Sequence, residues 1–109
     1  WGGLCPKKTD WFSHIDFVYS LIEQNQWSSI YWNYYFENDE FVRLMNRPYP
    51  IAVCGDIISY CTDSNERKFF MEYKVSDDYV LAETQIYVPN KGVQKFKSNY
   101  GINKIEISY

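Results

Sequence analysis

The second half of the sequence repeats one pattern, short apolar runs separated by turn residues, and this pattern constrains the fold more than any other feature. In the clearest run, residues 68–75, apolar side chains fall at alternate positions, with Phe70 as the one exception. Alternation is the period of a strand with one buried face. Short runs of the same kind favour strands at residues 57–60, 84–88, 93–97 and 102–109. Five short strands at a spacing of about ten residues predict a small antiparallel β-sandwich.

The first third of the chain has a different pattern. Residues 1–9 hold glycine and proline, which favour a loop. Thr9 or Asp10 can then cap a helix, because apolar residues recur at steps of three and four between residues 12 and 22. Asn25 is suited to a left-handed stop after it. The pattern predicts one amphipathic helix of about three turns.

The segment between this helix and the β region is rich in aromatic residues. Residues 27–35 favour a buried strand over a helix, since they combine aromatic side chains with a β-branched one. Residues 37–40 are polar and predict a loop, and residues 41–45 have room for one helical turn. Two prolines at residues 47–50 then forbid helix and favour an extended chain. We interpret the front third as the tail of an α/β layer.

Composition excludes several classes of protein. Hydrophobic residues make up 46% of the 109 residues and charged ones 23%, so the chain is not disordered by composition. The formal net charge is −3 with no run of like charge, so a nucleic-acid partner is not expected. No apolar stretch approaches the roughly 20 residues of a transmembrane helix. The chain opens on Trp1 without a signal peptide, and we expect a mature or truncated product.

The three cysteines and the one histidine do not form a metal motif. No pair has the CxxC or Cys/His spacing of a zinc site. Cys54 and Cys61 are seven residues apart in the β region, so they can form a disulfide or stay as two thiols. His14 falls on the expected helix, where a surface or packing role is the simplest interpretation.

Four segments, read in order, resemble the C-terminal part of glycoside hydrolase family 5 enzymes of the endoglycoceramidase type. The segments are Trp1-Gly2-Gly3, Tyr31-Trp32-Asn33-Tyr34, Arg47-Pro48-Tyr49-Pro50 with Ala52 and Gly55, and Thr84-Gln85-Ile86-Tyr87-Val88-Pro89. In that family a (β/α)8 barrel is followed by a small β-sandwich. The resemblance therefore implies that residues 1–46 are the last helix–strand units of the barrel and that residues 47–109 are the C-terminal β-sandwich domain.

The resemblance also implies an activity that this chain does not carry by itself. The family's catalytic nucleophile would be a Glu immediately before Trp1, and its acid/base Glu would lie far upstream. Both carboxylates of a retaining glycosidase would then lie outside these residues. The implied substrate is a glycosphingolipid, cleaved between oligosaccharide and ceramide. No cofactor is implied, a monomer is expected, and the family suggests an extracellular, vesicular or lysosomal location.

Three residues are candidates for substrate binding. Trp32 matches the family's tryptophan at the floor of the sugar subsite, although a strand tryptophan is more often a core residue. Asn33 and Tyr34 could donate hydrogen bonds beside it, or they could simply cap a strand end. The cluster Glu37, Asp39 and Glu40 has no apolar wall or basic partner to separate two pKa values, so a solvated loop is favoured over a substrate contact.

A different class of function also fits this composition. Aromatic residues make up 20% of the chain, which suits a non-catalytic β-rich carbohydrate-binding or interaction module. The amphipathic helix and the aromatic segment that precede the β region are not needed by such a module. This contrast favours the enzyme fragment over the binding module.

Overall fold

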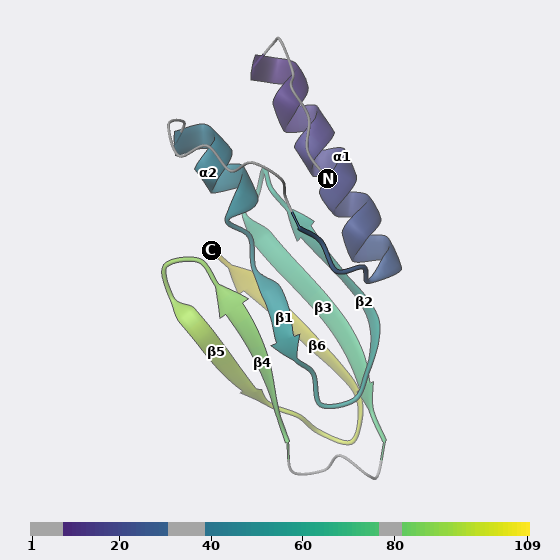
Figure 1. The fold of residues 1–109 in the computed structure, drawn as a ribbon. Coiled ribbons are helices and arrows are strands. Elements are labelled where there is room, and N and C mark those ends of the chain that lie inside the picture. The colour runs from purple at the N-terminus through teal and green to yellow at the C-terminus, as the bar shows by residue number, and fades with distance from the viewer. Residues whose placement is uncertain (1–7, 31–38, 77–81) are drawn as a thin grey trace. The chain divides into compact units, whose positions relative to one another are not determined.

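The computed structural model describes residues 8–30, 39–76 and 82–109 of the chain. By their contacts, the residues divide into two compact units, Trp1–Asn46 and Arg47–Tyr109. Figure 1 labels the elements of both. The first unit contains the helices α1 (Lys8–Asn25) and α2 (Asp39–Met45). The second contains the strands β1 (Tyr49–Ala52), β2 (Asp56–Asp63), β3 (Lys68–Val75), β4 (Glu83–Val88), β5 (Gly92–Lys97) and β6 (Gly101–Ser108).

Helix α1 is longer than the sequence predicts at both ends. Thr9 and Asp10 lie inside its first turn rather than before it. The left-handed residue at its C-terminal end is Gln26, with a φ of 53°, and not Asn25. Instead, the side-chain amide of Asn25 donates from Nδ2 to the Leu21 carbonyl at 2.8 Å and stabilises the last turn. The predicted left-handed stop was therefore wrong by one residue, and both predicted caps lie inside the helix, which begins at Lys8.

The end of α1 is a Schellman motif, which explains why a non-glycine residue is left-handed there. The Trp27 amide donates to the Ile22 carbonyl at 2.9 Å, and the Gln26 amide donates to the Glu23 carbonyl at 3.2 Å. These two bonds satisfy carbonyl groups that the helix leaves without an internal partner. They offset the cost of a positive φ at Gln26.

The strand predicted at residues 27–35 is wrong for the part of it that the structure describes. Residues 27–30 belong to no strand, and Trp27 and Ile30 are 59% and 83% exposed. A barrel strand is stabilised by neighbours that pair with it on both sides. The six described strands pair among themselves and offer this segment no such neighbour. Residues 31–35 lie outside the described residues.

Helix α2 includes residues that the sequence pattern assigned to a loop. Asp39 and Glu40 form its first turn, so the predicted loop at residues 37–40 is wrong at those two positions. The predicted turn at residues 41–45 is confirmed as part of this helix. Tyr19 of α1 donates from its hydroxyl to the Met45 carbonyl at 3.5 Å, which links the two helices of the unit.

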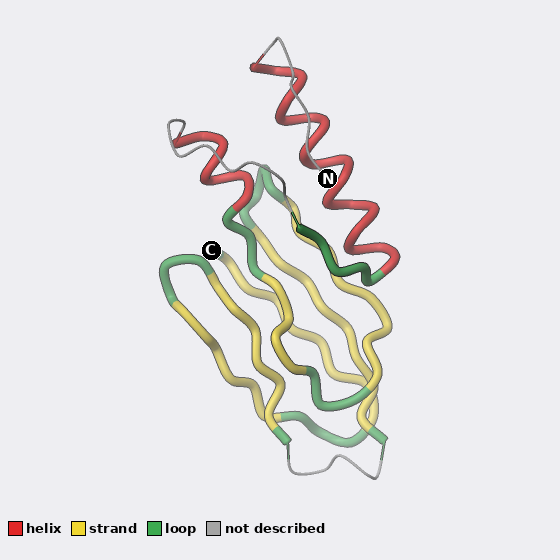
Figure 2. The backbone as a smooth tube through the Cα atoms, viewed as in Figure 1, coloured by secondary structure: helices red, strands yellow, loops and turns green. Residues whose placement is uncertain are grey.

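The second unit is an antiparallel β domain built from two sheets. One sheet has the strand order β1-β4-β5 and the other has the order β2-β3-β6. Every described pairing is antiparallel. All five predicted strands are confirmed, with ends that differ by a few residues at most, and Figure 2 shows them as the yellow segments of the tube. Strand β1 is an addition, because the sequence pattern gave only extended chain at its prolines.

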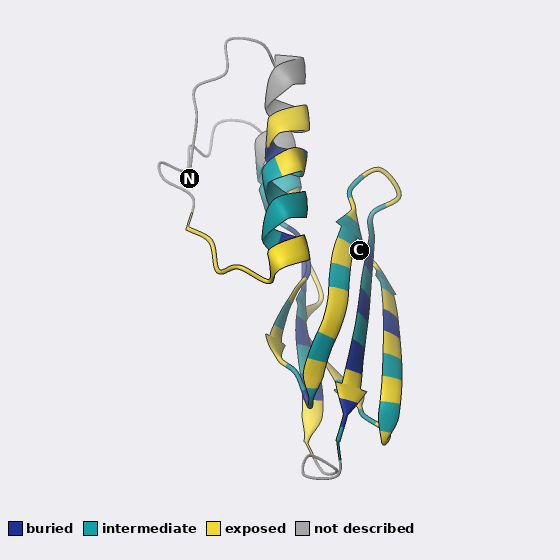
Figure 3. Cartoon of the chain, turned by 90° about the vertical axis from the view of Figure 1, so that its right-hand side faces the viewer, coloured by how far each residue is buried: buried dark blue, intermediate teal, exposed yellow. Residues whose placement is uncertain are grey.

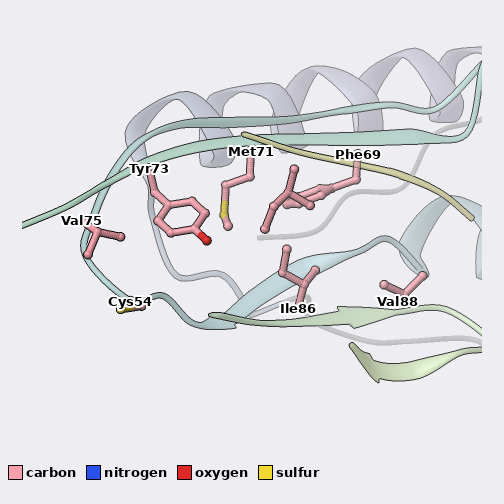
Figure 4. Close-up of a cluster of buried hydrophobic side chains, with 8 residues drawn as sticks. Cys54, Phe69, Met71, Tyr73, Val75, Ile86 and Val88 are labelled. Atoms are coloured by element: carbon pink, nitrogen blue, oxygen red, sulfur yellow. The ribbon is translucent and has the colours of Figure 1, made fainter. Parts of the chain in front are cut away.

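The core lies between the two sheets. Strand β3 contributes Phe69, Met71, Tyr73 and Val75, each at most 2% exposed, which confirms the predicted alternation. Strand β4 contributes Ile86 and Val88 from the other sheet, both fully buried. Figure 4 shows these side chains pointing toward one another from the two layers. Burying one such side chain contributes about 1.5–3 kcal/mol, so this cluster is the main source of stability.

A chain of buried and partly buried hydrogen bonds also joins the two sheets. The Cys54 amide donates to Thr84 Oγ1 at 3.0 Å, and Thr84 Oγ1 lies 3.2 Å from Ser98 Oγ. Ser98 Oγ in turn lies 2.9 Å from the hydroxyl oxygen of Tyr73 on the opposite sheet. Thr84 is fully buried, so these partners replace the water that its hydroxyl loses on folding.

Gly55 allows the chain to pass from the first sheet to the second. Its φ is 125°, a value that other residues rarely adopt. A Cβ built at this position would overlap the Lys74 carbonyl group, whose carbon it would approach to 2.9 Å. The glycine is therefore required both by its backbone angle and by the close approach of β3.

Candidate functional site

The three residues predicted to bind substrate, Trp32, Asn33 and Tyr34, lie outside the described residues. The structure places none of them, and their role stays a prediction. Asp39 and Glu40 lie on α2, and Glu37 lies outside the described residues. His14 is an exposed residue of α1. The described side chains that could form a binding site lie in the β domain.

The outer face of the sheet β1-β4-β5 is the most aromatic surface of that domain. Its core-facing side is fixed by Thr84, Ile86 and Val88, which are fully buried, so the residues between them point outward. We call the outward side chains of this sheet the tyrosine face; they are Tyr49, Ala52, Glu83, Gln85, Tyr87, Val93, Lys95 and Lys97. Figure 3 shows the alternation of buried and exposed positions along the strands.

Two tyrosine rings stack on the tyrosine face. Tyr49 and Tyr87 are direct cross-strand partners, and their ring centroids lie 5.1 Å apart with 30° between the ring planes. Tyr87 also pairs across the next strand with Val93. Tyr49 is on the edge strand of its sheet and is 53% exposed. One face of its ring is covered by Tyr87, and the side chain as a whole stays accessible to solvent.

The polar residues of the tyrosine face include one acidic and two basic side chains, Glu83, Lys95 and Lys97. The Lys95 ammonium lies 3.7 Å from the Glu83 carboxylate, on side chains that are 60% and 45% exposed. Gln85 is the direct cross-strand partner of Lys95 and occupies the row beside the tyrosines. The face thus combines an aromatic surface with amide and paired ionic groups.

The outer face of the other sheet has a different character. Lys68 pairs with Glu106, and Lys104 pairs with Glu72, with 3.3 Å between the charged atoms in both pairs. Exposed ion pairs of this kind contribute little, about 0–1 kcal/mol. This face carries exposed ion pairs beside the apolar residues Phe70 and Ile102. Among the described strands, the tyrosine face is the one that combines stacked aromatic rings with polar groups.

The cysteines and acidic residues of the described segments form no metal or disulfide site. Cys54 is buried and Cys61 is exposed, and no disulfide joins them. This outcome agrees with the thiol alternative left open by the sequence. Within the described ranges, no three His, Cys, Asp or Glu residues lie together in a group suited to a metal ion. Neither α1 nor α2, the helices described, has the length and apolarity needed to cross a bilayer.

Two three-stranded antiparallel sheets around one apolar core define residues 47–109 as a small β-sandwich domain. Residues 47–107, more than half of the 109-residue chain, match the family model of the glycoside hydrolase family 5 C-terminal domain. The chain therefore belongs to this family, and its parent is a glycosidase. A comparison with curated proteins gave no match. The predicted membership of glycoside hydrolase family 5 is confirmed, whereas the endoglycoceramidase type stays a prediction.

The tyrosine face is a functional candidate that the sequence patterns did not predict. Tyr87 belongs to one of the family segments and Tyr49 to the proline-rich segment at residues 47–50. The signal was present, because Tyr87 occupies the outward position between two core residues of a predicted strand. What could not be read from the sequence was the pairing of β1 with β4, which brings the two rings together.

Proposed function

We propose that this chain is the C-terminal part of a retaining glycoside hydrolase that cleaves glycosphingolipids between the oligosaccharide and the ceramide. The observation that carries the proposal is the family match over residues 47–107. The order of the four resembling segments supports the endoglycoceramidase type, since they span the chain from Trp1 to Pro89. In this proposal residues 1–46 are the end of the catalytic barrel, and the parent works outside the cell or in a vesicular compartment.

The proposed reaction needs two carboxyl groups about 5–5.5 Å apart, one as the nucleophile and one as the acid and then the base. We place the nucleophile on a Glu directly before Trp1 in the parent. The β domain contributes no reacting group in this mechanism. Its core and its inter-sheet hydrogen bonds give it a structural role, as a stable body at the end of the catalytic unit.

The experiment uses the parent protein that contains this chain. Hydrolysis of a fluorescent glycosylceramide is compared with hydrolysis of cellopentaose, and the anomer released first is identified by NMR. We expect cleavage of the glycolipid with retention of configuration, and loss of turnover when the Glu before Trp1 is replaced by Gln. Cleavage of cellopentaose alone would overturn the glycolipid assignment, and unchanged turnover of the Gln variant would overturn the position of the nucleophile.

Trp32 provides a second test of the same proposal. If its ring stacks on the sugar, Trp32→Ala in the parent removes a contact worth roughly 1–3 kcal/mol. We expect kcat/KM to fall by about ten- to a hundredfold with little change in Tm. A core tryptophan would instead cost about 3–5 kcal/mol of stability on truncation. A large fall in Tm with near-normal turnover would therefore contradict a role for Trp32 in the sugar subsite.

A further inference from the structure

The stacked pair Tyr49 and Tyr87 is a feature that neither the catalytic proposal nor the core explains. The buried face of the same sheet already holds Ile86 and Val88, and the tyrosines lie on its opposite side. Tyr49 keeps more than half of its surface accessible to solvent. Stacking against Tyr87 restricts the rotation of the Tyr49 side chain. The Tyr49 side chain therefore loses less conformational entropy when a ligand covers its ring.

The size of this aromatic surface indicates what can cover it. The large apolar side chains of the tyrosine face are Tyr49, Tyr87 and Val93, and Ile51, at the bulge of the edge strand β1, is also 48% exposed. A stable protein interface takes roughly 20–30 residues from each partner, which is far more than this row supplies. One or two sugar rings match it better, because the C–H face of a pyranose is about as large as one phenol ring and gains dispersion energy and desolvation by stacking on it.

The charges nearest the tyrosines favour a neutral ligand. Lys95 is paired with Glu83, so the row beside the tyrosines presents no net charge to an anionic lipid or a phosphate. Lys97 adds one positive charge to the face, but it lies opposite Glu83, in a row further from the tyrosines. Gln85 offers an amide that can both donate and accept, as hydroxyl groups require. These groups complement an uncharged polyhydroxylated molecule.

We propose that the tyrosine face is a carbohydrate-binding subsite, in which a pyranose ring of a neutral oligosaccharide stacks on Tyr49 and its hydroxyl groups bond to Gln85 and its neighbours. The subsite goes beyond the proposed hydrolysis, because it lies on the β domain and needs no catalytic carboxylate. In the parent it would hold the glycan part of a substrate at a place other than the point of cleavage.

The test is a titration of the ¹⁵N-labelled chain, residues 1–109, followed by NMR. The probes are lactose, maltopentaose, cellopentaose and xylopentaose, each added up to millimolar concentration. We expect at least one of them to shift the amide signals of residues 49, 85, 87 and 93 in a saturable manner. Shifts confined to other residues, or none with any of the four probes, would overturn the proposal. Shifts of the same signals on concentrating the chain without sugar would assign the face to self-association and would also overturn it.

Three variants separate stacking from a general effect on the fold. Tyr49→Ala should weaken binding by about tenfold or more, whereas Tyr49→Phe keeps the ring and should stay within about threefold of the unmodified chain. Tyr100→Ala is the matched control, because Tyr100 is 71% exposed and is not on this face. Equal binding by Tyr49→Ala and Tyr49→Phe would overturn the proposal.

Should Tyr49→Ala fail to fold, the map of shifted amide signals in the unmodified chain still decides whether the tyrosine face binds sugar. None of these outcomes depends on whether the parent hydrolyses glycolipids.

Discussion

At the scale of single residues, the family segments in this chain are explained by the fold of the β domain. Gly55 closes one of these segments, and its role is steric: a positive φ beside a close backbone carbonyl of Lys74. Thr84 opens the other segment, and its hydroxyl joins the two sheets through Ser98. The sequence showed that these residues resemble a family pattern. It did not show why, because both reasons depend on strands that meet only in the folded domain.

We expect Gly55→Ala to lower the free energy of unfolding by roughly 3–5 kcal/mol, since backbone strain and overlap with Lys74 add together. Gly92→Ala is the matched control. Gly92 also has a positive φ, 70°, but a Cβ there has no neighbour within 4 Å. The Gly92→Ala substitution should lower the free energy of unfolding by only about 1 kcal/mol. Urea unfolding of the two variants measures the difference, and equal losses would contradict the steric role of Gly55.

The hydrogen-bond chain makes a separate prediction. Thr84→Val keeps the shape of the side chain but removes the acceptor of the Cys54 amide, and it should cost about 1–3 kcal/mol. Ser98→Ala should cost about 1 kcal/mol. Because the two hydroxyls are partners, the double variant should lose less than the sum of the single variants, by about 0.5 kcal/mol or more. Strict additivity in chemical denaturation would show that this bond is not coupled to stability.

At the scale of elements, the clarity of the periodic signal decided which predictions held. Strand β3 was predicted with its observed bounds, because an eight-residue alternation has no comparable helical interpretation. Strand β1 was not predicted as a strand, since four residues that include a proline do not form a periodic pattern. It lies at the edge of its sheet, where proline is tolerated. Residues 27–30 show the opposite error, because aromatic content suggested a strand and these residues belong to none of the described strands.

The sheet order predicts how protection from hydrogen exchange is distributed. Strands β3 and β4 are central in their sheets and hold most of the core, whereas β1 and β5 are edges of their sheet. Amides of β3 and β4 should therefore exchange most slowly and open only with the whole domain. Native-state exchange followed by mass spectrometry or NMR can rank the strands. Slower exchange in β5 than in β4 would contradict the described order of the sheet.

At the scale of the whole molecule, the sequence predicted the β-sandwich domain better than it predicted a site. The family and the sandwich are established by the strands and the family match. The predicted sugar subsite at Trp32 lies outside the described residues and stays a prediction. The tyrosine face emerged only from strand pairing, which local sequence patterns do not encode. We propose that this chain is a non-catalytic part of a glycosidase and that the reacting carboxylates lie elsewhere in the parent.

Incubation of the purified 109-residue chain with a fluorescent glycosylceramide tests this claim most directly. A β-rich circular dichroism spectrum and a cooperative unfolding transition of the same preparation serve as the control that it is folded. The control for background activity is a mock preparation from cells that carry the empty vector. We expect the chain to release fluorescent product no faster than this control, because a retaining mechanism requires both carboxyl groups. Turnover above that rate by the folded chain, retained through a further purification step, would contradict the account.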